Sequence, residues 1–312
     1  MHGNDPAVAF LTDVLAGRVP VELPPEGREW DRTVELLYYH RLVGLWCAEA
    51  RARGLDYSPP GGDALAWRGL EAEYLGTAMH SSLVVESAQR AKRVLAEAGI
   101  PSLAFKGAAL LQDGTYPDPG ARSVGDTDLL VPREAVGEGV RALEMSGFEP
   151  WVEWDKARIE WLPAFTFTDR SVPEGMDVSL DLHWCTPYSS LRSSADATGE
   201  DLWTDADLDI GVPAVESHFL ILVEHFLKHL RVLTHLRGIG DLVRILPQVS
   251  RPEAVVDLAH RRGSVRGLRI MLAFLRDAIG VQVPEEFLSL AGVPMGRSRA
   301  HSGFLSPAQL MD

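Results

Sequence analysis

The other predicted elements of this chain are arranged around the stretch SLAFKGAALLQDGTYPDPGARSVGDTDLLV, residues 102–131. Leu103–Phe105 is a short apolar run that predicts a strand, and Lys106-Gly107 interrupts it before small and apolar residues at helical spacing. A turn-rich loop over residues 113–120 then leads to a second predicted strand, 125–131. The stretch therefore predicts a strand, turn, helix, loop and strand in sequence.

The second predicted strand carries two acidic residues. Because alternate side chains of a strand share a face, Asp126 and Asp128 point the same way, while Thr127, Leu129 and Val131 point into the core. Two carboxylates about 7 Å apart on one face repel each other, and a hard divalent cation between them removes that cost. On this account Asp128→Asn should leave the metal-free chain as stable as before, or more stable.

The Lys106-Gly107 turn suits a phosphate group. It offers close approach to the backbone, free N–H groups at a helix start and one cation. Carboxylates for a metal ion next to a turn for phosphate indicate phosphoryl chemistry.

Composition narrows the class of protein. The 312 residues carry a formal net charge of −14 and a pI of about 5.2, so nonspecific nucleic-acid binding is not expected. The two cysteines have no metal-type spacing, which indicates a reducing cytoplasm without a structural disulfide. We expect no signal peptide and no membrane span, because no basic start precedes an apolar run and no apolar run reaches about 18 residues.

Helices are expected on both sides of the central stretch. Residues 31–53 predict one helix that Gly54 ends, and residues 64–98 predict a long helix whose buried side includes Leu75 and Met79. The expected domains are an N-terminal helical region, a catalytic domain and a C-terminal helical domain, over residues 1–98, 99–210 and 211–312. The fold class is α+β, with a small mixed or antiparallel sheet flanked by the two helical regions.

A hairpin is predicted from residues 163–169 to residues 176–184, MDVSLDLHW. Its second strand separates polar from apolar side chains completely, with Asp177, Ser179, Asp181 and His183 on one face. A solvated outer face is one interpretation. A functional face is the other, and in that case Asp181 is the natural third carboxylate beside Asp126 and Asp128.

The C-terminal helices carry further candidates. His218, His225 and His229 fall on one helical stripe. No glutamate gives His225 and His229 the H-E-x-x-H arrangement of a zinc site, so hydrogen-bonded histidines are the preferred interpretation. Lys228 lies near the stripe and could meet a phosphate, and Arg237 and Asp241 are spaced as an ion pair.

The ordered segments FKGAALL, ARSVGDTDLLV, VSLDLHW, EHFLKHL and LRGIGDL resemble the uncharacterised nucleotidyltransferases of the DNA polymerase beta superfamily, over roughly residues 85–250. The resemblance implies a phosphate turn, a D-x-D pair on the next strand and a third carboxylate on a neighbouring strand. Here these are Lys106-Gly107, Asp126 with Asp128, and Asp181. The chain departs from the superfamily in having Lys-Gly for Gly-Gly or Gly-Ser, and in placing the pair nineteen residues after Gly107.

The implied reaction is metal-dependent transfer of a nucleoside monophosphate from an NTP to a hydroxyl or phosphate of a small molecule or peptide, with release of pyrophosphate. The resemblance implies Mg²⁺ (or Mn²⁺) on Asp126, Asp128 and Asp181, with Asp181 also able to act as a base that His183 orients. The expected triphosphate contacts are Lys106, Gly107, Arg122 and Lys228, and the expected supporting residues are His183, His225, Arg237 and Asp241.

Two alternatives remain open at this point. One is transfer of another activated phosphate group, such as that of a nucleotide-sugar, at the same site. The other is a non-catalytic nucleotide-binding or scaffold protein, against which the three acidic residues argue. A nucleic-acid acceptor and a membrane partner are not expected.

Overall fold

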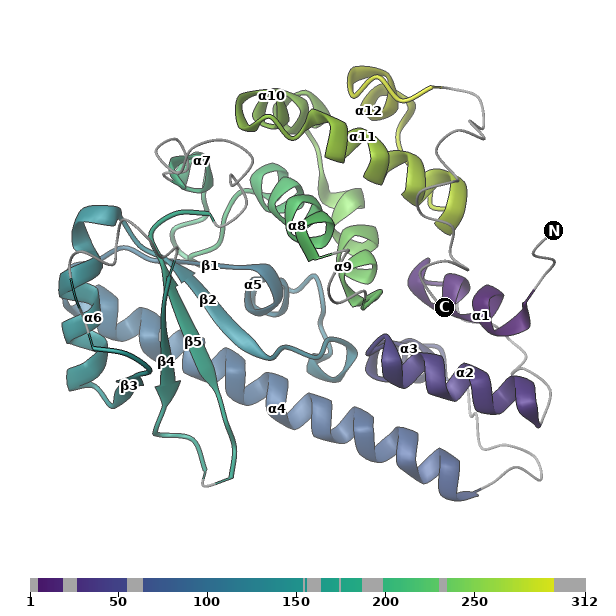
Figure 1. Cartoon of the computed structure of the whole chain (residues 1–312), viewed down its shortest axis with the longest axis horizontal. Helices are drawn as coiled ribbons and strands as arrows, with labels where there is room; N and C mark the ends of the chain where they lie inside the picture. The colour runs from purple at the N-terminus through teal and green to yellow at the C-terminus, as the bar shows by residue number, and fades with distance from the viewer. Residues whose placement is uncertain are drawn as a thin grey trace. The chain divides into compact units, whose positions relative to one another are not determined.

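The computed structural model of the chain describes residues 5–18, 27–54, 64–153, 155, 164–173, 175–186, 199–229 and 235–294 (Figure 1). By its internal contacts the chain divides into two units, one of residues 1–77, 120–122 and 222–312, and one of residues 78–119 and 123–221. Helices α4 (Ala64–Glu97) and α8 (Val215–His229) each contribute to both units. The predicted domain boundaries near residues 98 and 210 stay a prediction.

The second unit contains a five-stranded mixed sheet, which confirms the α+β class. Its strands are β1 (Leu103–Phe105), β2 (Asp126–Leu130), β3 (Phe148–Pro150), β4 (Ala164–Asp169) and β5 (Ser179–His183). They lie in the order β1-β2-β5-β4-β3. Strands β2 and β5 are parallel and every other neighbouring pair is antiparallel. The hairpin predicted from sequence is the β4–β5 pair.

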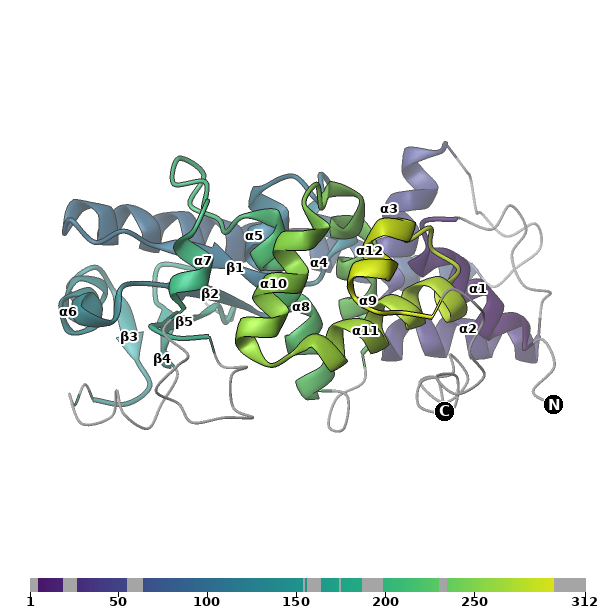
Figure 2. The ribbon, with the colours of Figure 1, turned by 90° about the horizontal axis from the view of Figure 1, so that it is seen from above.

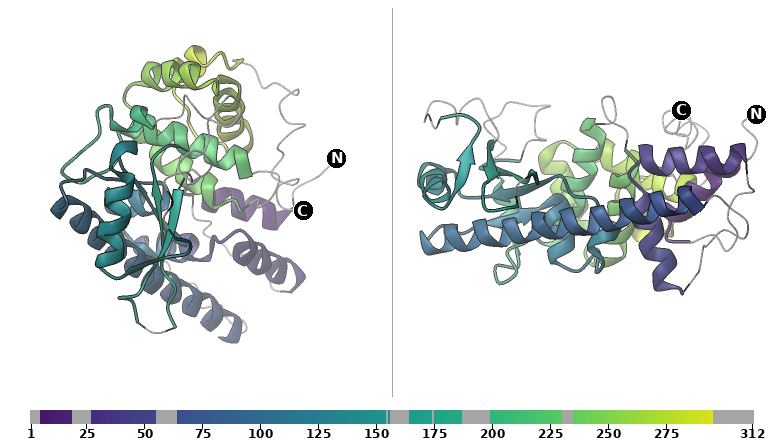
Figure 3. Two further views of the ribbon diagram at one scale, coloured as in Figure 1. Left: turned by 60° about the vertical axis from the view of Figure 1, so that its left-hand side comes forward. Right: turned by 90° about the horizontal axis from the view of Figure 1, so that it is seen from below.

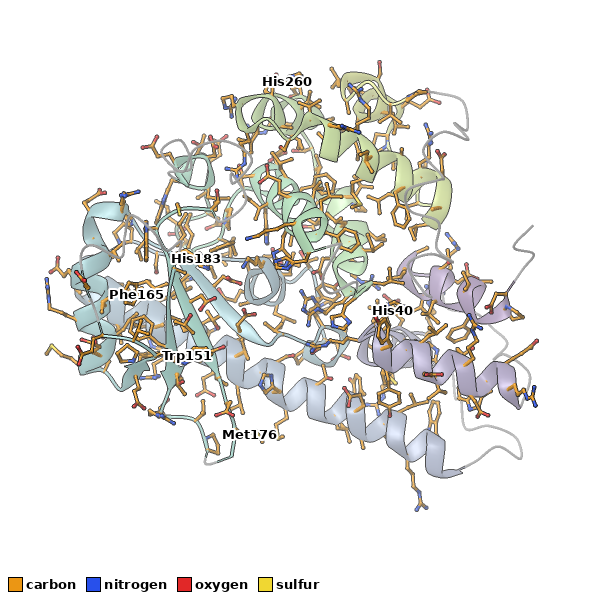
Figure 4. All side chains as sticks on the ribbon, in the orientation of Figure 1. His40, Trp151, Phe165, Met176, His183 and His260 are labelled. Atoms are coloured by element: carbon orange, nitrogen blue, oxygen red, sulfur yellow. The ribbon has the colours of Figure 1, made fainter. Side chains whose placement is uncertain are left out.

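One face of the sheet is apolar and packs against two helices, α4 and α6 (Val136–Met145). Alternate residues of β4 and β5 supply this face, as the two-residue period predicted. Figure 2 shows α6 beside β3, and Figure 4 labels Phe165 of β4 on the α6 side. The buried set joins sheet and helix residues: Ala91, Leu95, Leu129, Val140, Leu143, Phe165, Phe167, Leu180, Leu182 and Trp184.

The other face is polar near the middle of β2 and β5 and apolar at one end. There α7 (Glu200–Trp203) and the start of α8 cover the strands. Leu202 and Ile221 pack with Leu103, Phe105 and Leu130 in a small buried cluster. The polar side chains of this face are thus bordered by apolar packing.

Helix α4 also fixes the starts of the two parallel strands. Thr127 Oγ1 donates to the carbonyl of Val84, 3.2 Å away. The ring nitrogens of His80 lie 3.0 Å from the carbonyl of Val124 and 3.2 Å from that of Asp177, just before β2 and β5. Figure 3 shows α4 as one uninterrupted helix. These bonds set the position of the strand residues that carry the polar face.

The expected buried side of α4 is wrong at two positions, because Leu75 and Met79 are both exposed. The buried side also includes small and hydroxyl-bearing residues that were not predicted, among them Ser81, Ser87 and Ala88. Hydrogen bonds remove the cost of burying the hydroxyls: Ser81 Oγ accepts from the amide of Val124, and Ser87 Oγ donates to Asp169. The pattern of large apolar residues was therefore right at Leu70, Val84, Ala91 and Leu95 and wrong at Leu75 and Met79.

The single helix expected over residues 31–53 is also wrong. Helix α2 (Arg28–Tyr39) ends before α3 (Val43–Ala52), with Arg41 in the left-handed region at φ 56°. The amide of Leu42 bonds to the carbonyl of Leu37, as in a Schellman helix end. Glycine or asparagine usually occupies such a left-handed position, and an arginine there gives no sequence signal.

The remaining elements are helical. They are α1 (Pro6–Leu15), α5 (Lys106–Gln112), α9 (Arg237–Ile245), α10 (Pro252–Arg262), α11 (Val265–Phe274) with a π turn over Leu275–Ile279, and α12 (Glu285–Leu290). Short 3₁₀ turns occur at Pro119–Ala121, Arg133–Ala135 and Leu246–Gln248. Among the described residues, no helix is long and apolar enough to cross a membrane.

Asp169, at the end of β4, ties the sheet to α4 and provides a test of this packing. It is buried and accepts hydrogen bonds from Ser87, from the amide and hydroxyl of Ser171, and from Arg90. Burial alone would raise the pKa of Asp169, but the bonds from Ser87 and Ser171 and the charge of Arg90 outweigh it and lower the pKa. The ionised carboxylate is therefore the form that the fold stabilises.

Asp169→Asn should lower the free energy of unfolding at pH 7 by about 1–3 kcal/mol, because charge-assisted hydrogen bonds are lost. A group with a lowered pKa in the fold contributes stability above its unfolded pKa, and that contribution is lost as the pH falls through the folded pKa. The gap between wild type and variant should therefore narrow as the pH falls below the ordinary pKa of an aspartate and through the lowered pKa of Asp169. Urea unfolding at a series of pH values measures it, and a gap that stays constant would mean that Asp169 is not held ionised.

Candidate functional site

The parallel pairing of β2 and β5 brings two of the predicted carboxylates together. Asp128 lies opposite Asp181 in the register, and Leu130 lies opposite His183. One ligand atom each from Asp128, Asp181 and His183 lies within 4.8 Å of the other two. Figure 4 labels His183 on the sheet. We call these three residues the Asp-Asp-His cluster.

Asp128 is buried, at 2% exposure, and already has positive charge beside it. Its Oδ1 atom accepts from Lys106 Nζ at 2.5 Å and lies 2.9 Å from His183 Nε2. Burial alone would raise the pKa of Asp128, but the Lys106 ammonium and the bond from His183 outweigh it and hold the pKa well below its usual value. The sequence predicts that a divalent cation removes the repulsion between the carboxylates. The structure adds that Lys106 already neutralises the charge of Asp128 within the chain.

His183 is expected from sequence to orient Asp181, but it contacts Asp128 instead. An ionised carboxylate only accepts hydrogen bonds, so Nε2 of His183 carries the proton of this bond. The ring packs edge-on against Phe105, with ring centroids 5.1 Å apart. Its Nδ1 atom is buried and has no hydrogen-bond partner among the described residues.

Asp181 has a different environment from Asp128. It is half-buried, and Thr166 on the antiparallel neighbour β4 donates to its Oδ1 at 2.6 Å. Thr166 was not a predicted site residue. The alternation of polar and apolar residues along β4 could have predicted it, because this alternation places Thr166 on the polar face, where it lies opposite Asp181.

The Lys106-Gly107 turn is also more constrained than expected. Lys106 has φ 59°, a left-handed conformation that non-glycine residues seldom adopt, at the first residue of α5. Its amide is not available to a phosphate, because it donates to Nε2 of the buried His218 at 2.9 Å. Gly107 is buried in the same turn. His218 was seen from sequence only as one member of a histidine stripe, and its spacing to Lys106 in the chain gave no sign of this bond.

Asp126 is the predicted ligand that lies outside the cluster. It is the first residue of β2, exposed to solvent and opposite Ser179 of β5. It shares the face of Asp128 through the two-residue period, but it is not part of the group within 4.8 Å. Its predicted role as a metal ligand stays a prediction.

Arg122, a predicted phosphate contact, is held in a buried ion pair. Its Nε and Nη2 atoms donate to the two oxygens of Asp241 at 2.7 and 2.8 Å. The neighbouring backbone is fixed too, because a Cβ on Gly44 would lie 2.0 Å from the carbonyl oxygen of Gly120. The structure thus pairs Asp241 with Arg122, whereas helical spacing predicted a pair with Arg237. The phosphate contact of Arg122 and the supporting role of Asp241 stay predictions.

The other C-terminal candidates belong to the unit that does not contain the Asp-Asp-His cluster. His225 is half-buried with its ring centroid 4.7 Å from that of His229, and Lys228 is exposed. Arg237 is the first residue of α9. The predicted contacts of His225, Lys228 and Arg237 with the site stay predictions.

The sequence matches the family described as uncharacterised nucleotidyltransferase over residues 26–280. The chain belongs to this family. The match spans the sheet, the Asp-Asp-His cluster and most of the described helices, so the family resemblance found in the separate segments extends over most of the chain.

Among solved structures, the chain is similar to an antigenic nucleotidyltransferase-like protein from Paracoccidioides brasiliensis. The two share 16% sequence identity with a TM-score of 0.37, over 65% of this chain and 93% of that chain. A comparison with curated proteins gave no match.

The charge pairing at Asp128 reverses the stability effect expected from sequence. Asp128→Asn would leave the Lys106 ammonium, whose side chain is only 14% exposed, without its carboxylate. Breaking a buried ion pair is strongly destabilising, and the partial exposure of Lys106 puts the expected loss at the lower end, about 3 kcal/mol. Thermal and urea unfolding of the metal-free protein measure this loss.

The double variant Asp128→Asn with Lys106→Met is the control. It removes both charges and should recover part of the stability that the single substitution loses. If Asp128→Asn is as stable as the wild type, the Lys106–Asp128 ion pair does not stabilise the metal-free protein. Repulsion between the carboxylates would then be the dominant effect on its stability.

Proposed function

We propose that the chain transfers a nucleoside monophosphate from an NTP to a hydroxyl or phosphate of a small molecule or peptide. The acceptor oxygen would form a bond to the α-phosphorus. The bond from that phosphorus to the oxygen bridging to the β-phosphorus would break, and pyrophosphate would leave. The acceptor's proton would pass to a base on the protein, for which Asp181 is the proposed residue.

The observation that carries this proposal is the pairing of Asp128 with Asp181 on the parallel strands β2 and β5, in a chain of the nucleotidyltransferase family. Membership of the DNA polymerase beta superfamily is part of the proposal. It is supported by the order of the turn at Lys106, the D-x-D pair and a third carboxylate on the neighbouring strand.

The Asp-Asp-His cluster has a donor set and spacing that fit a divalent cation. Ligands at adjacent positions of an octahedral ion with bonds of about 2.1 Å lie about 3 Å apart. Asp128 Oδ1 and His183 Nε2 are 2.9 Å apart, and Asp181 completes a group within 4.8 Å. His183 Nε2 would bind a cation in the tautomer that carries the proton on Nδ1, the buried atom without a hydrogen-bond partner among the described residues. Carboxylate oxygens suit magnesium and manganese, and the imidazole nitrogen is accepted more readily by manganese.

In the proposed mechanism Asp128 and Asp181 would hold the cation, and the exposed Asp126 would add a ligand when nucleotide is present. The chemistry supplied by bound divalent cations, two in the expected mechanism, is neutralisation of phosphate charge and a lower pKa for the acceptor hydroxyl. Thr166 would keep Asp181 oriented through its 2.6 Å bond. The protein's own contribution is then positioning and charge.

Incubation with each NTP and either Mg²⁺ or Mn²⁺, followed by pyrophosphate assay and mass spectrometry of candidate acceptors, tests the reaction. Asp181→Asn should reduce pyrophosphate release by at least about 100-fold, because a metal ligand supplies several kcal/mol of transition-state stabilisation. The amide oxygen of Asn can still accept from Thr166, so the variant should fold normally. Asp177→Asn, on the same strand face but exposed and before β5, is the matched control and should keep wild-type release.

Two outcomes would contradict the proposal. Nucleotide binding without any pyrophosphate release, with every NTP and both metals, would indicate a binding or scaffold protein. Equal release by wild type and Asp181→Asn would place the reaction elsewhere.

A further inference from the structure

Lys106 forms an ion pair with Asp128, one of the carboxylates that would bind the proposed metal ion. Its Nζ atom bonds to Asp128 Oδ1 at 2.5 Å, and the same oxygen lies 2.9 Å from His183 Nε2. Among the described residues, only Asp128, Asp181 and His183 form a group able to hold a metal ion, and the ammonium already neutralises one of them. The metal-free site therefore carries its own cation.

We propose that Lys106 is an exchangeable counter-ion: it occupies Asp128 in the empty site and leaves it for the triphosphate when a divalent cation binds. This inference rests on the proposed function. An ammonium and a divalent cation on one carboxylate repel each other in a buried site, where water screens charge poorly. An ammonium displaced from Asp128 is stabilised by an anion, and a bound triphosphate would supply one.

The local backbone allows this exchange without movement of the turn. The amide of Lys106 is fixed to the buried His218 at 2.9 Å, and the residue is held at φ 59°. The side chain has flexible carbon–carbon bonds and is 14% exposed, so its ammonium can turn toward solvent while its amide stays in place. His218 would thus be a positioning residue, which holds the base of a side chain that moves.

The exchange predicts coupling between the two ligands. Metal alone must displace Lys106 and should bind weakly, whereas NTP offers the displaced ammonium a new partner. By thermodynamic linkage, each ligand then raises the affinity for the other by the same factor. In a site without such an internal cation, metal would bind the empty protein more tightly.

Titration calorimetry with Mn²⁺ alone, and then with a non-hydrolysable NTP analogue, tests this exchange. Lys106→Met removes the charge and keeps much of the side-chain length. It should raise the affinity for Mn²⁺ alone by about tenfold or more and lower the affinity for the NTP analogue by about tenfold or more, as expected for one charge-assisted contact. The two changes have opposite signs, which a merely structural lysine would not produce.

Two matched variants separate this effect from general electrostatics. Lys106→Arg keeps the charge at the site and should bind Mn²⁺ alone about as weakly as the wild type. Arg93→Met, at an exposed position of α4, changes the net charge equally and should leave Mn²⁺ affinity unchanged. If circular dichroism shows that Lys106→Met is unfolded, Lys106→Gln takes its place, since Gln can still donate to Asp128 without a charge.

The outcomes distinguish this inference from the function on which it rests. If the wild type binds Mn²⁺ and the NTP analogue together but Lys106→Met binds Mn²⁺ alone no more tightly, the exchange is wrong and the proposed function stands. If neither protein binds Mn²⁺, with or without the analogue, the proposed metal site itself is wrong. Wild-type Mn²⁺ affinity that does not change with the analogue present would also overturn the exchange.

Discussion

The charge of Asp128 is the constraint on which the rest of the site depends. A carboxylate at 2% exposure cannot stay ionised unless positive charge or hydrogen-bond donors surround it. Lys106 and His183 supply both, and each is held by a further contact: the backbone of Lys106 by His218, and the ring of His183 by Phe105. The arrangement therefore extends from one buried oxygen to β1, α5 and α8.

The scaffold around this oxygen follows from ordinary packing. The apolar face of the sheet is covered by α4 and α6, so the opposite face can carry polar side chains without loss of the core. Hydrogen bonds from α4 to the residues around Val124 and Asp177 fix where β2 and β5 begin. A parallel pair with fixed starts has a fixed register, and that register brings Asp128 opposite Asp181.

Much of this could be predicted from the sequence because it depends on local periodicity. The alternation in MDVSLDLHW gave the two faces of β5, and the apolar run before Lys106 gave β1 and the turn. The bonds of Lys106 with Asp128 and of Arg122 with Asp241 could not be predicted. Lys106 and Asp128 are 22 positions apart in the chain, and Arg122 and Asp241 are 119 positions apart. Which of these residues pair therefore depends on tertiary packing.

Other errors have conformational causes. Arg41 and Lys106 both adopt a left-handed backbone conformation that is not expected for arginine or lysine. The helix break at Arg41 and the constrained turn at Lys106 were therefore not predicted. On α4, serines are buried beside the large apolar residues that periodicity favours, because nearby strands and loops offer them hydrogen-bond partners. At Lys106 and on α4, long-range hydrogen bonds stabilise local arrangements that the sequence alone disfavours.

A crystal structure with Mn²⁺ and a non-hydrolysable NTP analogue would show whether Asp128 and Asp181 hold a metal ion that displaces Lys106, because manganese can be located by its anomalous scattering. A manganese peak should lie within about 2.2 Å of oxygens from both Asp128 and Asp181, with the α-phosphate beside it and Lys106 Nζ moved from Asp128 to a phosphate oxygen. An analogue bound with no manganese at these carboxylates, and with Lys106 still on Asp128, would contradict it.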